Sequence, residues 1–209
     1  MRESTPLWSF RKGVVPSALS ISLDGKFAGV GHKRGLLLLH NAGGLTWSTK
    51  KIRRVRDISI SSRTGKMSIA SGQKVVYLID RKGAIIWHRE LQSSAVSTSI
   101  SSDGNVIVVG TNLGRLVVFN GKGKILWEAH LSNSDFPVNS VDISSDGKFI
   151  VAGTDYSHIY LYDTKGKILW AKETTGEVLQ TCINSNGDYL GYLTSDCKFS
   201  FGVKSSRIL

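Results

Sequence analysis

The chain alternates short apolar runs with turn residues, and one such pattern recurs along its whole length. Its clearest copy begins with Val141-Asp142-Ile143, turns at Asp146-Gly147, continues through the apolar run 149–153 and the run 159–163, and ends at Trp170. Short apolar runs separated by Asp-Gly and Lys-Gly turns predict antiparallel strands joined by hairpins. Each copy therefore predicts a small β-meander that finishes with an aromatic residue.

Two independent landmarks measure the period of this pattern. Pairs of the type Ile-Ser or Ile-Asn begin at residues 21, 60, 100, 143 and 183, and the tryptophans are Trp8, Trp47, Trp87, Trp127 and Trp170. A period of about 40 residues with four strand-like segments is typical of a β-propeller blade. Helical repeats are excluded, because no long segment spaces its apolar residues for a helix and glycine turns interrupt every unit.

The strands within one unit differ in polarity. Second strands such as 106–109 and 149–152 are apolar on both faces, which predicts blades stacked face to face. First strands carry small or polar residues at one equivalent position, which suits a crowded and hydrated central channel: Ser20, Ser59, Ser99, Asp142 and Cys182. Gly31, Gly110 and Gly153 end the second strands where backbones approach closely, and we expect Ser71 and Leu193 to depart from this pattern.

The two ends of the chain are each an incomplete unit. Leu7-Trp8-Ser9-Phe10 matches a fourth strand, whereas the last unit stops before its tryptophan. We therefore predict one domain, residues 1–209, with an all-β fold: a five-bladed β-propeller of four-stranded antiparallel blades, its ring closed by the N-terminal strand. Such a closed ring is expected to be a monomer. Because residues 207–209 align with residues 167–169, a fragment of a longer propeller is the alternative.

Two stretches resemble known repeat families. Residues 143–149 resemble the inner-strand hairpin of WD-repeat propellers, and residues 162–170 resemble the strand, turn and tryptophan of pyrroloquinoline-quinone-type (PQQ-like) repeats. Both resemblances imply the propeller fold and leave the function open, because packing and turn residues define these families. The Trp-Asp dipeptide of WD repeats is replaced here by His40, Asp80, Asn120 and Asp163. The cofactor and calcium ligand motifs of PQQ quinoprotein enzymes cannot be placed in this sequence.

Composition bears on the class of partner and on location. The chain has 27 Lys and Arg against 16 Asp and Glu, a formal charge of +11, which favours anionic partners. The same lysines and arginines also keep a sheet-rich protein soluble, so charge alone does not establish a partner. No apolar run is long enough for a transmembrane segment and no secretory signal follows Met1, so we expect a cytoplasmic protein with free thiols at Cys182 and Cys197.

The residues that carry most enzymatic chemistry show no catalytic spacing. The five histidines and two cysteines lack metal-ligand spacing, and no phosphate-binding Gly-rich loop occurs. The aspartates beside glycine, such as Asp103 and Asp146, are explained by turn geometry. We therefore predict a protein that is not an enzyme, with no cofactor and no metal.

One basic segment departs from the repeat. The connection between the first and second complete units contains Lys50, Lys51, Arg53, Arg54 and Arg56, whereas the equivalent connections at residues 90–94 and 173–177 contain no such cluster. Blade topology places this loop on the same rim as Lys33 and Arg34, and Arg11-Lys12 belongs to the preceding equivalent loop. The prediction is a basic sector on one rim, opposite a sector that carries Asp135, Glu173 and Glu177.

Three classes of function are considered, and the first two use this sector. The first is a non-enzymatic interaction scaffold that presents Lys33, Arg34, Lys50, Lys51, Arg53, Arg54 and Arg56 to an acidic protein partner. The second is a nucleic-acid-associated protein that binds phosphates through the same residues, although few aromatic residues accompany them for base stacking. The alternative to both is that the basic segment is a solvated loop that binds no ligand. The third and least supported class is a PQQ-type quinoprotein enzyme.

Overall fold

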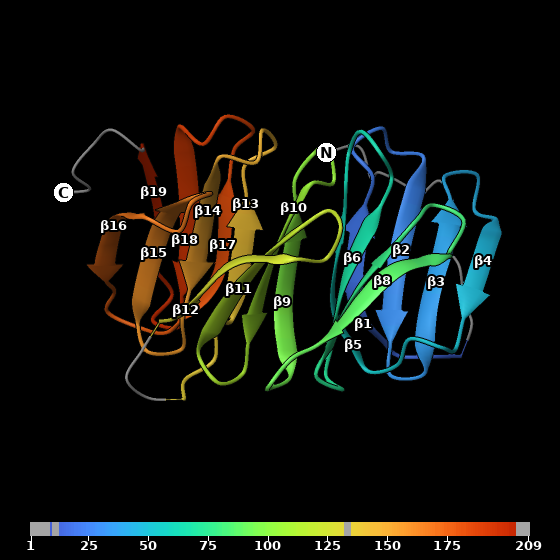
Figure 1. The fold of residues 1–209 in the computed structure, drawn as a ribbon, viewed down its shortest axis with the longest axis horizontal. Coiled ribbons are helices and arrows are strands. Elements are labelled where there is room, and N and C mark those ends of the chain that lie inside the picture. Colours follow the sequence, from blue (N-terminus) through green and yellow to red (C-terminus); the bar gives the residue numbers. More distant parts are fainter. Residues whose placement is uncertain (1–8, 10–12, 132–134, 204–209) are drawn as a thin grey trace, which may run out of the picture.

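The computed structural model describes residue 9 and residues 13–131 and 135–203, and in these ranges every regular element is a β-strand (Figure 1). The strands form antiparallel meanders. The first sheet contains β1 (Pro16–Ile21), β2 (Phe27–His32), β3 (Gly35–His40) and β4 (Leu45–Thr49), and the second contains β5 (Val55–Ile60), β6 (Met67–Ser71), β7 (Val75–Ile79) and β8 (Ile85–Glu90). The third contains β9 (Ala95–Ile100), β10 (Val106–Thr111), β11 (Arg115–Asn120) and β12 (Ile125–His130). The fourth contains β13 (Ser140–Ile143), β14 (Phe149–Gly153), β15 (His158–Asp163) and β16 (Ile168–Glu173), and the last contains β17 (Val178–Ile183), β18 (Tyr189–Thr194) and β19 (Phe199–Val203). The predicted all-β fold of antiparallel four-stranded units is confirmed.

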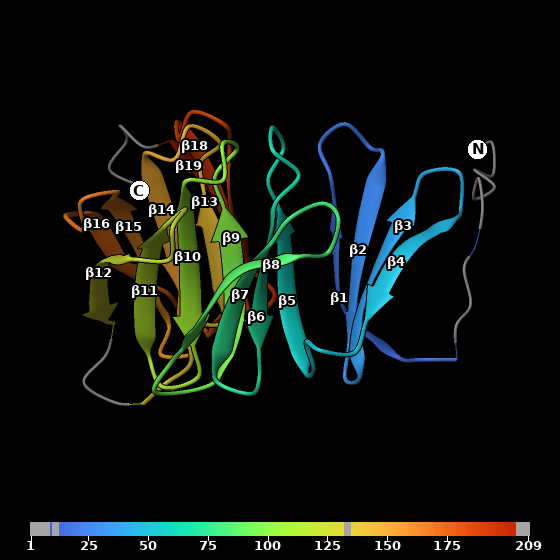
Figure 2. The same ribbon diagram turned by 45° about the vertical axis from the view of Figure 1, so that its right-hand side comes forward.

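The sheets follow one another along an arc, from the blue first sheet to the red last sheet (Figures 1 and 2). The first strands of successive sheets pack together, as β1 with β5, β5 with β9, β9 with β13, and β13 with β17. In the described part of the chain, β1 and β17 form no comparable contact. The predicted five-bladed closed ring is therefore not confirmed. Most of its closing strand, residues 7–10, lies outside the described residues, so its pairing with the last sheet stays a prediction.

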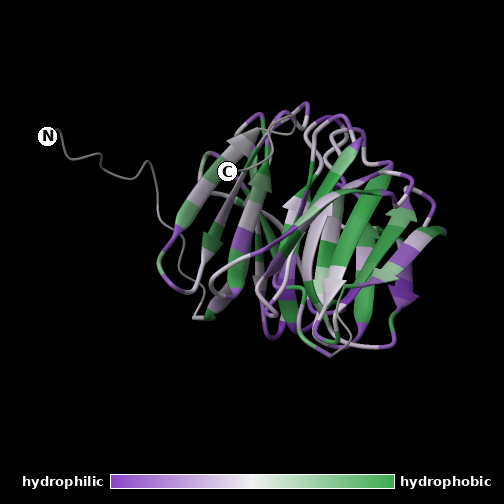
Figure 3. Ribbon diagram, turned by 90° about the vertical axis from the view of Figure 1, so that its left-hand side faces the viewer, coloured by the Kyte–Doolittle hydropathy of each residue, from purple (hydrophilic) through white to green (hydrophobic). Residues whose placement is uncertain are grey.

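The core lies between the sheets and repeats at each junction. Apolar residues concentrate on the strands and hydrophilic ones on the turns (Figure 3). One buried cluster joins the first and second sheets through Leu38 and Ile58, and another joins the third and fourth through Val118 and Ile150. The second strands are buried on both faces, as their composition predicted, because each internal sheet has a neighbour on either side.

Each junction fits a side chain into a space left by a small residue. A methyl group added to Gly31 would lie 2.3 Å from Val55 Cγ1, which is far inside van der Waals contact. The same fit occurs three times, with Gly31 against Val55, Gly110 against Val138, and Gly153 against Val178. Glycine is therefore required at these strand ends by the next sheet.

The second sheet has two alanines where other sheets have glycine and valine. This corrects the expectation that Ser71 stands at the glycine position. Strand pairing places Ala70, and not Ser71, level with Gly31 and Gly110. Ala70 carries the methyl group that the glycines lack. Ala95, at the start of β9, lies in the same buried cluster and lacks the branched methyl groups of valine. The total volume at the junction is thereby conserved, which is how cores tolerate substitution.

A tryptophan clamps the outer edge of the first three junctions. Trp47 Nε1 donates a hydrogen bond to the carbonyl oxygen of Arg81 at 2.8 Å, and its ring packs on Gly83, which has φ +84. Trp87 and Trp127 repeat this contact with the next hairpins. The buried Nε1 of Trp170 has no partner, and the equivalent hairpin follows Val203, beyond the described residues. Trp47, Trp87 and Trp127 therefore join neighbouring sheets, in addition to lying on the fourth strand of their own sheet.

Polar groups connect the first strands across the junctions. Asp57 Oδ2 accepts a hydrogen bond from Thr98 N, and Asp142 Oδ2 accepts one from Ile183 N. Ser99 Oγ donates to Asp142 Oδ1 at 2.8 Å. Burial raises the pKa of Asp57 to about 6 and also raises the pKa of Asp142, although the backbone donors act in the opposite direction.

We predict that the glycine and valine at one junction are energetically coupled. Gly31→Ala should lower the free energy of unfolding by about 1–3 kcal/mol, because the added methyl group overlaps Val55. Val55→Ala should also destabilise the chain by opening a cavity. The double variant recreates the Ala70 and Ala95 pair. Its loss in free energy of unfolding should be smaller than the sum of the losses in the two single variants, and urea denaturation measures all three.

The matched control is Gly44→Ala, because a methyl group there would meet nothing within 4 Å. Its free energy of unfolding should stay close to that of the wild-type chain. Strictly additive losses in the double variant would contradict the proposed fit between Gly31 and Val55.

The Asp57 carboxyl predicts a pH dependence of stability. Its pKa rises from 3.8 to about 6 on folding, so between these values the folded chain retains a proton that the unfolded chain has released. The free energy of unfolding should therefore fall as the pH rises from about 4 to 6, by up to roughly 3 kcal/mol for this group. Asp57→Asn should reduce that slope in urea titrations at several pH values. An unchanged slope would show that Asp57 does not titrate in this range.

Candidate functional site

The basic connector between β4 and β5 is anchored at several points. Ile52 is buried in the cluster shared by the first two sheets, so the loop cannot swing freely. Arg54 N donates to the carbonyl oxygen of Lys33, and Gly72 N donates to the carbonyl oxygen of Arg54, both at 2.9 Å. Ser71 Oγ donates to the Arg53 carbonyl oxygen at 2.8 Å. The connector is thus held between the β2–β3 turn and the β6–β7 turn.

Arg54 adopts a backbone conformation that arginine rarely takes. Its φ is +49, within the left-handed region that favours glycine. The carbonyl groups at the equivalent connector positions, Ser94, Pro137 and Glu177, accept the same hydrogen bond from the next turn. In the part of the chain that the structure describes, Arg54 is the only residue of these four with positive φ. A charged residue in a strained position is a reason to consider a role beyond folding.

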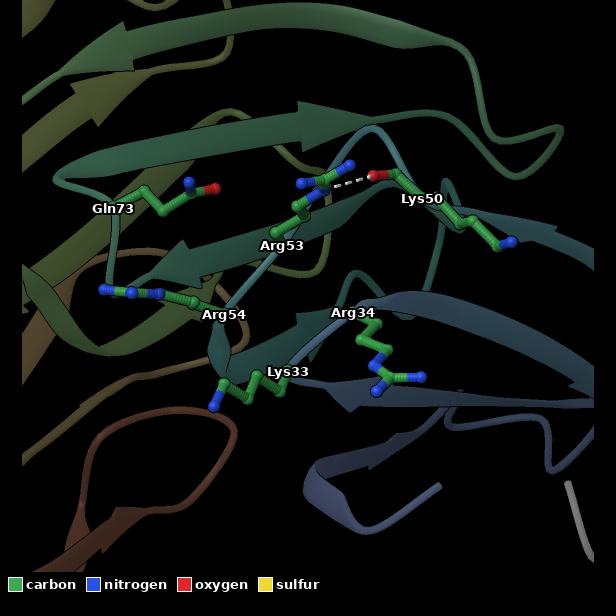
Figure 4. A pocket seen from close by; sticks show the side chains of 6 residues that line it. All are labelled: Lys33, Arg34, Lys50, Arg53, Arg54 and Gln73. Atoms are coloured by element: carbon green, nitrogen blue, oxygen red, sulfur yellow. Dashed lines mark hydrogen bonds between the residues drawn. The ribbon is translucent and has the colours of Figure 1, made fainter. Parts of the chain in front are cut away.

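The anchored loops enclose a basic pocket of about 520 Å³ on this rim (Figure 4). It is lined by Lys33, Arg34, Lys50, Arg53, Arg54 and Gln73. Figure 4 shows the side chains coming from three loops, with Arg53 Nε donating to the Lys50 carbonyl oxygen at 3.3 Å. Among the described residues, no carboxylate, thiol or imidazole lines this pocket. Its chemistry therefore suits the binding of an anionic group.

The remaining predicted site residues border the same pocket. Lys51 lines an adjoining depression that also includes Lys50 and Arg53. Arg56 lines a second one, which reaches Val15 and Pro16 at the start of the first sheet. The structure thus brings all seven predicted basic residues into one sector, which is called the basic sector below. Arg11 and Lys12, expected beside it, lie outside the described residues.

Sequence reasoning missed Gln73. It lies in the β6–β7 turn, whose backbone holds the basic connector in place through Gly72. Blade topology alone would have placed this turn beside the connector. Gln73 was not included because the prediction was based on charged residues. An amide in the lining adds a group that can both donate and accept hydrogen bonds.

The basic sector lacks internal compensation. Among the residues that the structure describes, no acidic side chain forms an ion pair with any of the seven basic residues, and all ion pairs lie elsewhere. On the equivalent connectors of later sheets stand Asp135, which pairs with His130, and Glu177. The rim therefore changes from basic at the first two sheets to more acidic at the last two.

The other chemically reactive groups form no second site. Cys182 and Cys197 are exposed free thiols, as the sequence predicted. Within the described ranges, no group of three His, Cys, Asp or Glu side chains is arranged to hold a metal ion. The same ranges contain no helix long and apolar enough to cross a membrane.

The fold defines the class of this protein, and a family comparison identifies it further. Stacked antiparallel units of four strands, with a tryptophan packed on a hairpin glycine at the first three junctions, are the construction of β-propeller repeat proteins. The family of PQQ-like repeats described as "Outer membrane protein assembly factor BamB" matches residues 33–144 and 72–190, two segments offset by one repeat. The chain belongs to this family. The resemblance to PQQ-like repeats is thereby confirmed, whereas the resemblance to WD repeats is not shown. No curated protein matches the chain.

We predict that Arg54→Gly stabilises the fold while it removes one charge from the basic sector. Glycine adopts φ +49 without a steric penalty, so the free energy of unfolding should rise by up to about 1 kcal/mol. Arg54→Ala is the matched control, because alanine loses the same charge and keeps the backbone penalty. Equal stability of the two variants in urea denaturation would rule out strain at this position.

Proposed function

We propose that this protein is a non-enzymatic interaction scaffold that presents its basic sector to an acidic surface of a protein partner. The observation that carries the proposal is the convergence of seven cations from loops that the repeat does not require to be basic, with no carboxylate of the described residues paired to them. The family description, an assembly factor, supports interaction with proteins. Rigid loops that carry unpaired charge favour fast and oriented docking.

The pocket lining favours binding over catalysis. Five cations and one amide can hold a carboxylate or phosphate group, but they provide no nucleophile or general base of the usual kinds. Arginine dominates the sector, and its planar guanidinium pairs with carboxylates through two hydrogen bonds. We therefore include no catalytic step, no cofactor and no metal in the proposal. The cytoplasmic location and the single-domain organisation stay predictions.

Binding of nucleic-acid phosphates through the same residues is the second candidate, and the net charge of +11 favours it. The residues that line the basic pocket include no aromatic side chain on which a base could stack. An acidic protein surface fits this lining better, because it offers carboxylates without requiring stacking.

Charge reversal tests the proposal. In a pull-down from lysate of the source cells, the variant Arg53→Glu, Arg54→Glu, Arg56→Glu should lose the partner proteins that wild-type protein retains at low salt, and rising salt should release them from wild-type protein. The matched control is Lys82→Glu, Lys122→Glu, Lys124→Glu, which changes the net charge equally in turns on the opposite rim. Its partner binding should be unchanged.

Two results would redirect the interpretation. Equal partner retention by both triple variants would remove the basic sector from the function. Loss of binding to unrelated RNA and DNA in the first variant only, with steep salt dependence of wild-type binding from about 50 mM upward, would favour the nucleic-acid candidate.

A further inference from the structure

The rim repeats one local arrangement where a connector meets the turn of the next sheet. The carbonyl oxygen of Arg54 accepts a hydrogen bond from Gly72 N, and that of Pro137 accepts the equivalent bond from Asp155 N, both at 2.9 Å. These bonds align the connector and turn of the second sheet with the connector and turn of the fourth sheet. The basic pocket therefore has an equivalent place beside the fourth sheet.

This equivalent place carries aromatic side chains instead of basic and amide ones. Counted from the aligned hydrogen bonds, Phe136 stands at the position of Arg53, and Tyr156 stands at the position of Gln73. Both aromatic side chains reach the surface, because Phe136 is 38% exposed and Tyr156 is 52% exposed. The repeat does not require rings here, since the second sheet folds in the same way without them.

The two exposed rings are the outer end of a longer row of rings. Phe136 stacks on Tyr156 with ring centroids 5.1 Å apart, and Tyr156 stacks on His158 at 5.3 Å with an interplanar angle of 3°. His158 in turn stacks on Tyr160 at 6.0 Å, and Tyr160 contacts Tyr162. Tyr162 is buried in the cluster between the third and fourth sheets. The core thus holds the exposed rings in place.

Hydrogen bonds fix the row further. Tyr160 Oη donates to the carbonyl oxygen of Leu131 at 2.7 Å, which ties the row to the start of the connector. His158 Nδ1 lies 2.6 Å from the carbonyl oxygen of Tyr156. Because a carbonyl oxygen only accepts hydrogen bonds, Nδ1 carries a proton, and Nε2 of the neutral ring is an acceptor. A surface that is already ordered loses little conformational entropy when a ligand binds.

Carboxylates flank the exposed rings. The side chain of Asp135 is 72% exposed, and its contact with His130 is long, at 3.8 Å. Glu173 is exposed and pairs with His158 across β15 and β16, so the two side chains lie on the same face of the sheet. Among the described residues, Glu173 forms no ion pair. The exposed rings and their polar neighbours are called the aromatic shelf below: Asp135, Phe136, Tyr156, His158 and Glu173.

The positive net charge of the chain does not determine the potential at this place. Charges separated by more than about 8 Å are largely screened at physiological ionic strength. The basic residue nearest in sequence to Glu173 is Lys172, which is paired with Ile159. Ile159 packs against the last sheet, so Lys172 lies on the opposite face of the fourth sheet. The local charge therefore favours a cationic ligand.

From these observations we propose that the aromatic shelf binds an arginine side chain of a protein partner. A guanidinium group is planar, so it stacks on an exposed ring such as Phe136 while its N–H groups pair with the carboxylates of Asp135 and Glu173. The Nε2 atom of a neutral His158 accepts a further hydrogen bond. Lysine fits less well, because its ammonium group is a compact charge that does not stack. This site is separate from the basic sector and has the opposite charge preference.

Peptide binding tests the class of ligand. The probe is a short Gly-Ser peptide that contains several arginines, and matched peptides contain lysine, citrulline or proline at the same positions. The full chain should bind the arginine peptide more tightly than the lysine peptide by about 2- to 10-fold in calorimetric titration, and the uncharged citrulline peptide more weakly than either. Undetectable arginine binding, equal affinity for the arginine and lysine peptides, or tightest binding of the proline peptide would overturn the proposal.

Substitutions test the location of the site. Phe136→Leu and Tyr156→Leu keep an apolar side chain but remove the ring, so each should weaken binding of the arginine peptide by about 2- to 10-fold. Glu173→Gln should weaken it too and reduce its salt dependence. The matched control is Leu113→Ala, because Leu113 occupies the position of Tyr156 in the third sheet and is 39% exposed. Its affinity for the peptide should equal that of wild-type protein.

Melting temperatures and a basic-sector variant complete the test. If either leucine variant has a lowered melting temperature, Glu173→Gln decides the outcome, because it alters an exposed side chain. The variant Arg53→Ala, Arg54→Ala, Arg56→Ala should retain arginine-peptide binding whether or not the basic sector binds an acidic partner. Wild-type affinity in both Phe136→Leu and Glu173→Gln would refute the aromatic shelf as the site.

Discussion

Every sheet in this protein depends on its neighbours, because a four-stranded unit with two apolar faces cannot be stable in water alone. The fit of Val55 into the space beside Gly31 shows how closely neighbouring sheets approach, and Trp47 holds the outer edge of the same junction. Aspartates such as Asp142 connect the inner edge through backbone donors of the next sheet. Packing, not strand propensity, therefore sets the spacing of the whole array.

The junctions also determine where the loops lie. Each connector carbonyl accepts a hydrogen bond from the next turn, so the rim is a series of loops with defined neighbours. In one connector this scaffold holds Arg54 in a left-handed conformation between Lys33 and Gly72. A basic pocket arises there without any special element, because the repeat supplies the geometry and local substitutions supply the charge. This division of roles is common in repeat proteins that bind partners along a rigid surface.

The family and the surface provide different kinds of information. Membership of the PQQ-like repeat family accounts for the turns, the tryptophans and the stacked sheets, which are shared by proteins of many functions. The basic sector rests on charged residues that the repeat itself does not require. It is polar and lies on the rim, whereas the family features lie in the strands and turns.

The sequence alone determined the strands, the turns and the period, because apolar alternation, Asp-Gly pairs and regular tryptophans are local signals that recur in every unit. It also predicted that Lys33 and Arg54 share a rim, since a regular meander fixes which turns lie together. It did not predict that Ala70 occupies the place of Gly31, that Gln73 joins the pocket, or that β1 and β17 remain apart. Only the tertiary structure decided these points, because they depend on strand register and on the angle between sheets, which are set by contacts between residues about 40 positions apart.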